Sequence, residues 1–129
     1  MANLLGSFKL VSSENFGDFL KEIGVGLVTR KMAETSKPTV EIKQEGAEYV
    51  IKTLAFKNSE IRFKLGEEFE ENRLDGATVK TVVTLEGGKL VQKQFGDKEV
   101  TITREVDGDT LKVTCQSGTV VSTRVYQRE

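Results

Sequence analysis

The sequence predicts an all-β fold, an antiparallel barrel of roughly nine or ten strands with two helices between its first and second strands. Turn-forming residues recur about every 8–12 residues, which is typical of short strands joined by tight turns. They lie at Glu45-Gly46, Lys57-Asn58-Ser59, Asp75-Gly76, Glu86-Gly87-Gly88, Gly96-Asp97, Asp107-Gly108-Asp109 and Ser117-Gly118. An open sheet of this width would leave unprotected edges, so we expect it to curl into a barrel or flattened clam. Closing more than about eight strands leaves an interior too wide for side chains to fill, which predicts a ligand cavity.

Between the turns, apolar and polar side chains alternate, as in strands with one buried face. From Val100 to Val106 the even-numbered positions are apolar except for Arg104. The same period occurs at Ile61, Phe63 and Leu65, at Val79, Thr81, Val83 and Leu85, and at Leu111, Val113 and Cys115. We expect the first strand over Phe8–Val11 and the second after Pro38.

The segment between these two strands has a helical period instead. Apolar residues at Phe16, Phe19, Leu20 and Ile23 follow i, i+3, i+4, i+7 spacing, after Ser12, Ser13 and Asn15 as candidate N-caps. After Gly24 and Gly26, the residues Val25, Val28 and Met32 predict a second short apolar face, with Arg30 and Lys31 directed elsewhere. We expect this helix-turn-helix to cover one mouth of the barrel.

The amino-acid composition excludes several classes of function. A chain of 129 residues with 37% hydrophobic and 30% charged residues is expected to form a single domain over residues 1–129. A formal net charge of -1 argues against a general nucleic-acid binder. The absence of histidine excludes Ser-His-Asp and Cys-His chemistry and His-ligated zinc. With one cysteine, no secretory signal pattern and no apolar run of about 20 residues, we expect a soluble intracellular protein.

Two arginines are the most informative polar residues. Arg104 shares a strand face with apolar residues, and a buried guanidinium needs an anionic partner or water. Arg124, Tyr126 and Ser122 share a face of the last strand. If both faces point inward, they form a carboxylate site. The opposite face of the last strand, with Val121 and Val125, could equally be the buried one.

Four other motifs in the sequence do not predict a binding or catalytic site. Gly24-Val25-Gly26 is a lone G-x-G and favours a helix-helix turn over phosphate binding. Asp107-Gly108-Asp109 lacks the remaining ligands of a calcium loop. Four acids around Phe69, at positions 67, 68, 70 and 71, are expected to be a solvated face, so no metal site is predicted. Cys115 has no histidine to activate it and is expected to point inward.

Three stretches together resemble a known family. They are Gly6–Leu10 with Ser13–Phe16, Gly24–Gly26 and Thr29–Lys31; Phe56–Ile61 through Lys64–Phe69; and Ser122–Tyr126. Their order and spacing, over essentially the whole chain, resemble the intracellular lipid-binding (fatty-acid-binding) protein family. Ile61–Glu68 and Thr84–Leu90 look most like its heart, adipocyte and myelin branch. Gly17 departs from the pattern, because members commonly have an acid there.

The resemblance implies a ten-stranded up-and-down β-clam capped by two helices and enclosing a cavity for a long-chain fatty acid. The family's carboxylate-binding positions match Arg104, Arg124 and Tyr126. Members that carry retinol have glutamines in place of the arginines, so retaining both implies an acidic ligand. The implied cavity and portal positions are Phe16, Leu20, Val25, Ala33, Pro38, Phe56, Asp75 and Cys115.

The resemblance also implies a role. We expect a monomeric cytoplasmic carrier without a cofactor, with access to the nucleus as in some members. Its helical cap, through Lys21, Arg30 and Lys31, is expected to touch membranes transiently. A retinoic-acid carrier shares the same three carboxylate-binding residues and is the first alternative. A lipid-modifying enzyme is the second, although no nucleophile stands beside a suitable base.

Overall fold

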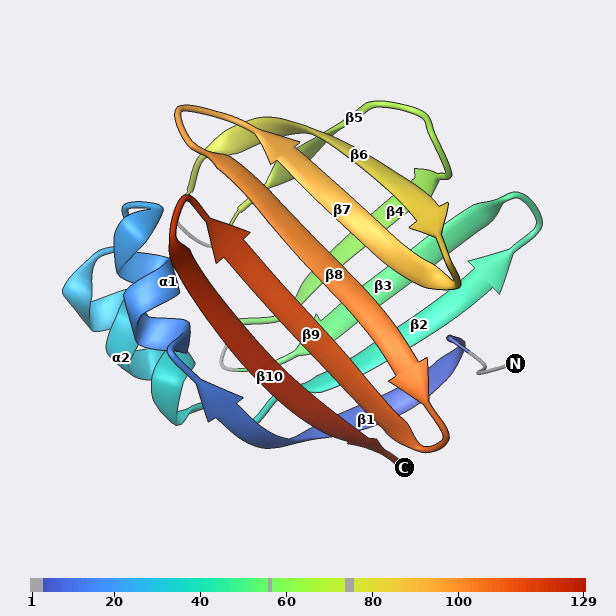
Figure 1. Cartoon of the computed structure of the whole chain (residues 1–129), viewed down its shortest axis with the longest axis horizontal. Helices are drawn as coiled ribbons and strands as arrows, with labels where there is room; N and C mark the ends of the chain where they lie inside the picture. Colours follow the sequence, from blue (N-terminus) through green and yellow to red (C-terminus); the bar gives the residue numbers. More distant parts are fainter. Residues whose placement is uncertain (1–3, 56, 74–75) are drawn as a thin grey trace.

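Ten strands and two helices make up the protein in the computed structural model, which describes residues 4–55, 57–73 and 76–129 (Figure 1). In chain order they are β1 (Gly6–Glu14), α1 (Phe16–Glu22), α2 (Leu27–Thr35), β2 (Thr39–Glu45), β3 (Glu48–Leu54), β4 (Ser59–Lys64), β5 (Phe69–Asn72), β6 (Thr78–Glu86), β7 (Lys89–Phe95), β8 (Glu99–Asp107), β9 (Thr110–Ser117) and β10 (Val120–Arg128). This confirms the predicted all-β class with a helix pair between the first and second strands.

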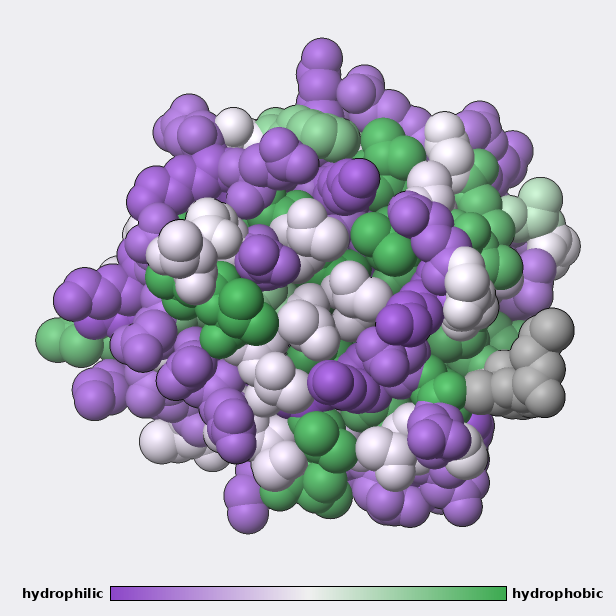
Figure 2. Space-filling model, in the orientation of Figure 1, coloured by the Kyte–Doolittle hydropathy of each residue, from purple (hydrophilic) through white to green (hydrophobic). Residues whose placement is uncertain are grey.

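All ten strands belong to one antiparallel sheet that curls into a nearly closed barrel. Its strand order is β4-β3-β2-β1-β10-β9-β8-β7-β6-β5, so the chain ends pair with each other and β4 and β5 are its two edges. In Figure 1 strands β6 to β10 cross in front of β1 to β4, and the helices lie at one end. The face over the front strands mixes hydrophilic and apolar residues, as expected of a solvated outer surface (Figure 2).

Strand β1 is longer than the predicted Phe8–Val11 because it pairs on both sides. Gly6 to Lys9 pair with β2, while Phe8 to Glu14 pair with β10. The register with β10 shifts between Leu10 and Ser12, where a bulge leaves Val11 facing solvent. Ser12 and Ser13 therefore belong to a strand, and their prediction as helix N-caps is wrong.

Aromatic side chains bridge the gap between β4 and β5. The ring of Phe63 in β4 stacks on Tyr49 in β3 and on Phe69 in β5, with centroids 5.8 and 5.7 Å apart.

The backbone N–H of Gly66 donates to the carbonyl of Val83, at 2.8 Å. Gly66 has φ 77, a left-handed conformation suited to glycine, in a turn that the sequence analysis missed.

Helix α1 packs on β10 and β9 through Phe19 and Leu20, which are buried as its period predicts. Asn15 occupies the N-cap position with φ 60, and its side chain makes no cap bond. Its amide donates instead to the carbonyl of Val121, at 3.4 Å. Asn15 thus ties the start of the helix to β10.

Of the three residues predicted to form a second apolar face, Val25, Val28 and Met32, only Val25 is buried. Val28 is 73% exposed and Met32 is 46% exposed, whereas the small residue Ala33 is buried. Helix α2 packs against α1, and Ala33 is its buried residue, so its larger apolar side chains at Val28 and Met32 lie outside. Arg30 is not directed away either, since its Nη1 donates to the carbonyl of Val25 at 2.9 Å.

In the part of the chain that the structure describes, neither helix has the length and apolarity to span a membrane.

Replacing Phe63 with Ala is expected to lower the free energy of unfolding by about 3–5 kcal/mol, because the change empties a buried site between two rings. Urea denaturation measures the loss. Leu65→Ala is the control, since Leu65 lies close by at 37% exposure and its truncation is expected to cost under about 1 kcal/mol. Equal losses in the two variants would contradict a bridging role for the stack.

Candidate functional site

The last strand turns its polar face inward. Ser122, Arg124 and Tyr126 of β10 are buried, while Val121 is exposed. The sequence favoured neither face of this strand, and in the curled sheet the polar face lies inside, where Ser122, Arg124 and Tyr126 pair with the buried residues Cys115, Val113 and Leu111 of β9. Arg124 lies opposite Val113, and Val113 lies opposite Arg104 of β8 on its other side. The two arginines are therefore in one row across the sheet, about 10 Å apart at their backbones.

Arg124 is a buried cation with unused hydrogen-bonding capacity. It is 6% exposed, and its guanidinium carbon lies 3.9 Å from the ring centroid of Phe16. Its Nε and Nη2 atoms are buried and have no acceptor within the described residues. The aromatic face contributes cation–π attraction, but it cannot accept the in-plane N–H groups of these two nitrogens. The geometry thus leaves part of a guanidinium fork open to an acceptor.

Arg104 begins a polar chain through the interior. Its Nη1 donates to Oε1 of Gln92 at 2.5 Å, and Nε2 of Gln92 donates to Oε1 of Glu71 at 2.6 Å. Gln92 is fully buried on β7. One side chain, Gln92 of β7, therefore connects Arg104 of β8 to a carboxylate on β5.

Glu71 is the centre of this network. Besides Gln92, the hydroxyl of Thr81 and the amide of Gln94 donate to the same Oε1 atom, at 3.0 and 3.1 Å. The prediction of a solvated acidic face holds for positions 67, 68 and 70, which are exposed, but it is wrong for Glu71. Its two-residue spacing from the half-buried Phe69 was the signal that could have identified it.

Burial dominates the electrostatics of this cluster. Burial lowers the pKa of Arg104 and raises the pKa of Tyr126, and the charges of both arginines partly oppose the rise at Tyr126. Burial likewise raises the pKa of the Cys115 thiol to about 11, against the opposing effect of Arg104 and Arg124. These four groups therefore act on one another across the barrel interior. Because a guanidinium remains protonated in proteins, the cluster is cationic at neutral pH.

Five of the predicted cavity and portal residues belong to the helical cap or to the start of the strand that follows it. Phe16, Leu20, Val25 and Ala33 come from the helical cap, and all are buried except Phe16, which is half-buried. Pro38 is buried at the start of the second strand, and its carbonyl accepts from the backbone N–H of Leu10 at 3.0 Å. Phe56 and Asp75 lie outside the described residues.

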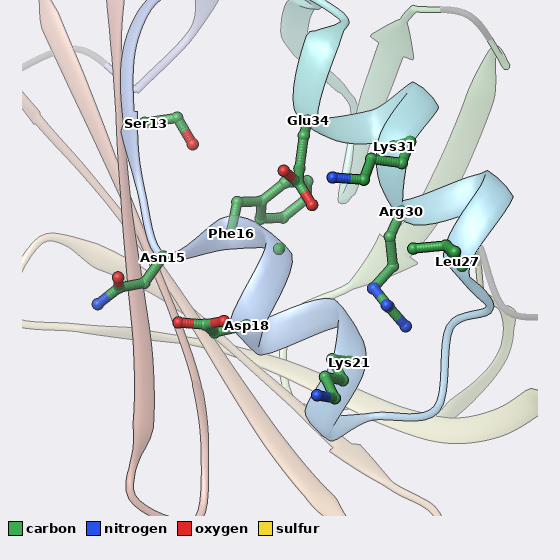
Figure 3. Close-up of a pocket in the computed structure, with 10 residues that line it drawn as sticks. Ser13, Asn15, Phe16, Asp18, Lys21, Leu27, Arg30, Lys31 and Glu34 are labelled. Atoms are coloured by element: carbon green, nitrogen blue, oxygen red, sulfur yellow. The ribbon is translucent and has the colours of Figure 1, made fainter.

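A groove of about 460 Å³ opens on the outer side of the cap, between α1, α2 and the end of β1 (Figure 3). Lys21, Arg30 and Lys31 line it together with Asp18 and Glu34. A side chain at Gly17 would collide with the Glu34 carboxylate, which already occupies that space. Phe16 lines the groove and also lies under Arg124, so it separates groove from interior.

Chemically, the interior arrangement suits the binding of one organic anion. Arg124 offers an open fork, the phenol of Tyr126 lies on the same face, and Arg104 adds charge from β8. Within the described ranges, no three His, Cys, Asp or Glu side chains are grouped so that they could hold a metal ion.

Residues 5–129 match the lipocalin / cytosolic fatty-acid binding protein family. The chain is 55% identical over 131 residues to the fatty acid-binding protein of Tyrophagus putrescentiae, covering 100% of both chains. The crystal structure of the fatty acid-binding protein from brain tissue of Drosophila melanogaster is 50% identical, with a TM-score of 0.93 over 97% of this chain and 99% of that one. The Schistosoma mansoni fatty acid binding protein in complex with arachidonic acid is 41% identical, with a TM-score of 0.94 over 97% and 95%.

Alkylation of Cys115 by iodoacetamide is expected to be slow at pH 8 and to accelerate as the pH rises toward about 11, because burial disfavours the thiolate. In urea-unfolded protein the acceleration should come about two units lower, near the ordinary value of 9.0. Mass spectrometry of quenched samples gives both rates. A native rate equal to the unfolded rate at pH 8 would show that the thiol is accessible and unshifted.

Proposed function

Because the chain belongs to the lipocalin / cytosolic fatty-acid binding protein family, we propose that it is a carrier that binds a long-chain fatty acid inside the barrel and transports it through the cytosol. Residues 1–129 would act as one domain and one monomer. The proposal rests on a family of binding proteins and on an interior with unmet cationic donors.

The two buried nitrogens of Arg124 without an acceptor among the described residues are the observation that carries this proposal. A buried ion without a partner costs several kcal/mol, so a protein that keeps one needs a ligand or water to complete it. A carboxylate matches the guanidinium fork with two parallel, charge-assisted hydrogen bonds. In this proposal Tyr126 donates its phenolic hydrogen to the same carboxylate, and Arg104 adds attraction from β8.

Accessible surface retained by inward-facing residues of β8 supports an interior binding site. Val100 and Val106 of β8 are buried, yet Ile102 and Arg104 between them keep some accessible surface on the same inward face. An acyl chain placed there would leave water at about 0.8 kcal/mol for each methylene group. The tail would thus supply much of the affinity, while the arginines fix its orientation and discriminate against neutral lipids.

The helical cap is the proposed route of release to membranes. Lys21 and Lys31 are exposed beside the outer groove, and the exposed Val28 and Met32 lie on the same helix pair. Cationic and apolar groups together favour transient contact with anionic lipid surfaces.

Titration of the delipidated protein with oleate by calorimetry tests the proposed ligand, since the chain has no tryptophan to report binding. We expect one oleate per chain, and an affinity about 10- to 100-fold weaker in Arg124→Gln, as loss of charge-assisted hydrogen bonds worth about 1.5–3 kcal/mol predicts. Arg62→Gln is the control, because it makes the same change at an exposed position of β4.

Retinoic acid and retinol are titrated in parallel. Tight binding of retinoic acid without oleate binding would favour the retinoid carrier over the fatty-acid carrier. Oleate consumed with formation of a product would favour the enzyme. An Arg124→Gln protein that binds oleate as tightly as the wild type would contradict the assigned head-group site.

Neutralising the cap with Lys21→Gln and Lys31→Gln is expected to slow transfer of a fluorescent fatty acid to anionic phospholipid vesicles several-fold, since each lysine near such a surface contributes about 1 kcal/mol. Equilibrium affinity should not change. Stopped-flow transfer measures the rate, and the pair Lys80→Gln and Lys93→Gln, on exposed positions of β6 and β7, is the control. The same slowing in both pairs, or with neutral vesicles, would exclude a specific role for the cap.

A further inference from the structure

We propose that Glu71 is an internal counter-ion that sets the charge of the head group this site accepts, so that it takes a monoanion in preference to a dianion. This inference rests on the proposed function, because it concerns the same interior site. It assigns a role in specificity to a residue that does not itself touch the ligand.

Buried side chains of the neighbouring strands hold the Glu71 carboxylate in a defined position. Three donors from two neighbouring strands converge on its Oε1 atom: Thr81 of β6 at 3.0 Å, and Gln92 and Gln94 of β7 at 2.6 and 3.1 Å. All three donor residues are buried. A hydroxyl and two amides donating to one oxygen hold a carboxylate in place without neutralising its charge. Glu71 is thus a fixed negative charge on the inward side of β5.

This charge reaches the head-group cluster through Gln92. The amide of Gln92 accepts from Arg104 and donates to Glu71, so its dipole aligns with both ions. The carboxylate also opposes the pKa-lowering effect of burial at Arg104. Glu71 and Arg104 therefore form an ion pair separated by one amide. Arg104 keeps other N–H groups for a ligand, but its charge is already largely balanced.

Charge balance then defines the ligand. In the network and the head-group cluster, Arg104 and Arg124 contribute two positive charges and Glu71 one negative charge, which leaves one positive charge. A carboxylate neutralises that remainder. A dianion such as a phosphate monoester would leave a negative charge inside the barrel, which a site of low dielectric constant disfavours.

The test compares three ligands with the same alkyl chain: dodecanoate, dodecyl phosphate and 1-dodecanol. At pH 8 the phosphate monoester is a dianion, since its second pKa is about 6. Glu71→Gln keeps the shape and an acceptor oxygen but removes the charge. We expect this variant to bind dodecanoate about tenfold more tightly than the wild type. Coulomb energy scales with ligand charge, so the energy gained for the dianion is about twice that for the monoanion. The affinity for dodecyl phosphate should therefore rise by about the square of the factor for dodecanoate, roughly 100-fold. The neutral alcohol should change by less than about twofold.

Glu70→Gln is the matched control, because it makes the same change one residue earlier, on the exposed side of β5. It should leave all three affinities unchanged. If Glu71→Gln changes the affinities for the anions and for the alcohol by the same factor, Glu71 contributes only to packing. If the variant binds the anions more weakly than the wild type does, Glu71 positions Arg104. Either result would overturn the counter-ion role.

If Glu71→Gln does not fold, as judged by circular dichroism, the same comparison is made between Arg104→Gln and Arg104→Gln/Glu71→Gln. Removal of the carboxylate should again favour the dianion more than the monoanion, and an unchanged ratio would overturn the inference. Failure of the proposed function has a different signature, since oleate would then not bind to the wild type. The ratio of phosphate to alcohol affinity would still report whether Glu71 acts on the interior charge.

Discussion

The pairing of β1 with β10 joins the two ends of the chain, and the architecture of the site depends on it. It unites the strand runs on either side into one sheet, whose edges come to lie at β4 and β5. It also sets Ser13 opposite Arg124, so that the chain leaves β1 and enters α1 directly over that arginine. Phe16 can therefore lie on the guanidinium because a strand register places it there.

Buried charge is the second constraint, and the barrel meets it in two ways. Arg104 is balanced from within by Glu71 through Gln92. Arg124 has an aromatic face on one side and two nitrogen atoms without an acceptor in the described residues. An interior that combines one compensated and one uncompensated cation is costly as a core but well suited to an anionic ligand.

Much of the fold could be predicted from the sequence because strand period and turn residues are local signals. The predicted strands lie close to the observed ones, and the apolar period of α1 matches its buried side. The errors lie where packing overrides local pattern. Ser12 and Ser13 extend a strand because β10 pairs with them, and in α2 the buried residue is Ala33 rather than Val28 or Met32.

For the site, alternation alone determined that Arg124 and Tyr126 share one face of a strand, and that Arg104 lies among apolar neighbours. Only the tertiary structure decided that the Arg124 face points inward, since both faces of β10 carry a plausible set of buried residues and the curl of the sheet selects one. The tertiary structure alone also brought Glu71 to Gln92, from strands that are not adjacent in the sheet. The spacing of residues along the chain cannot predict this contact, because the contact depends on how strongly the barrel bends between its strands.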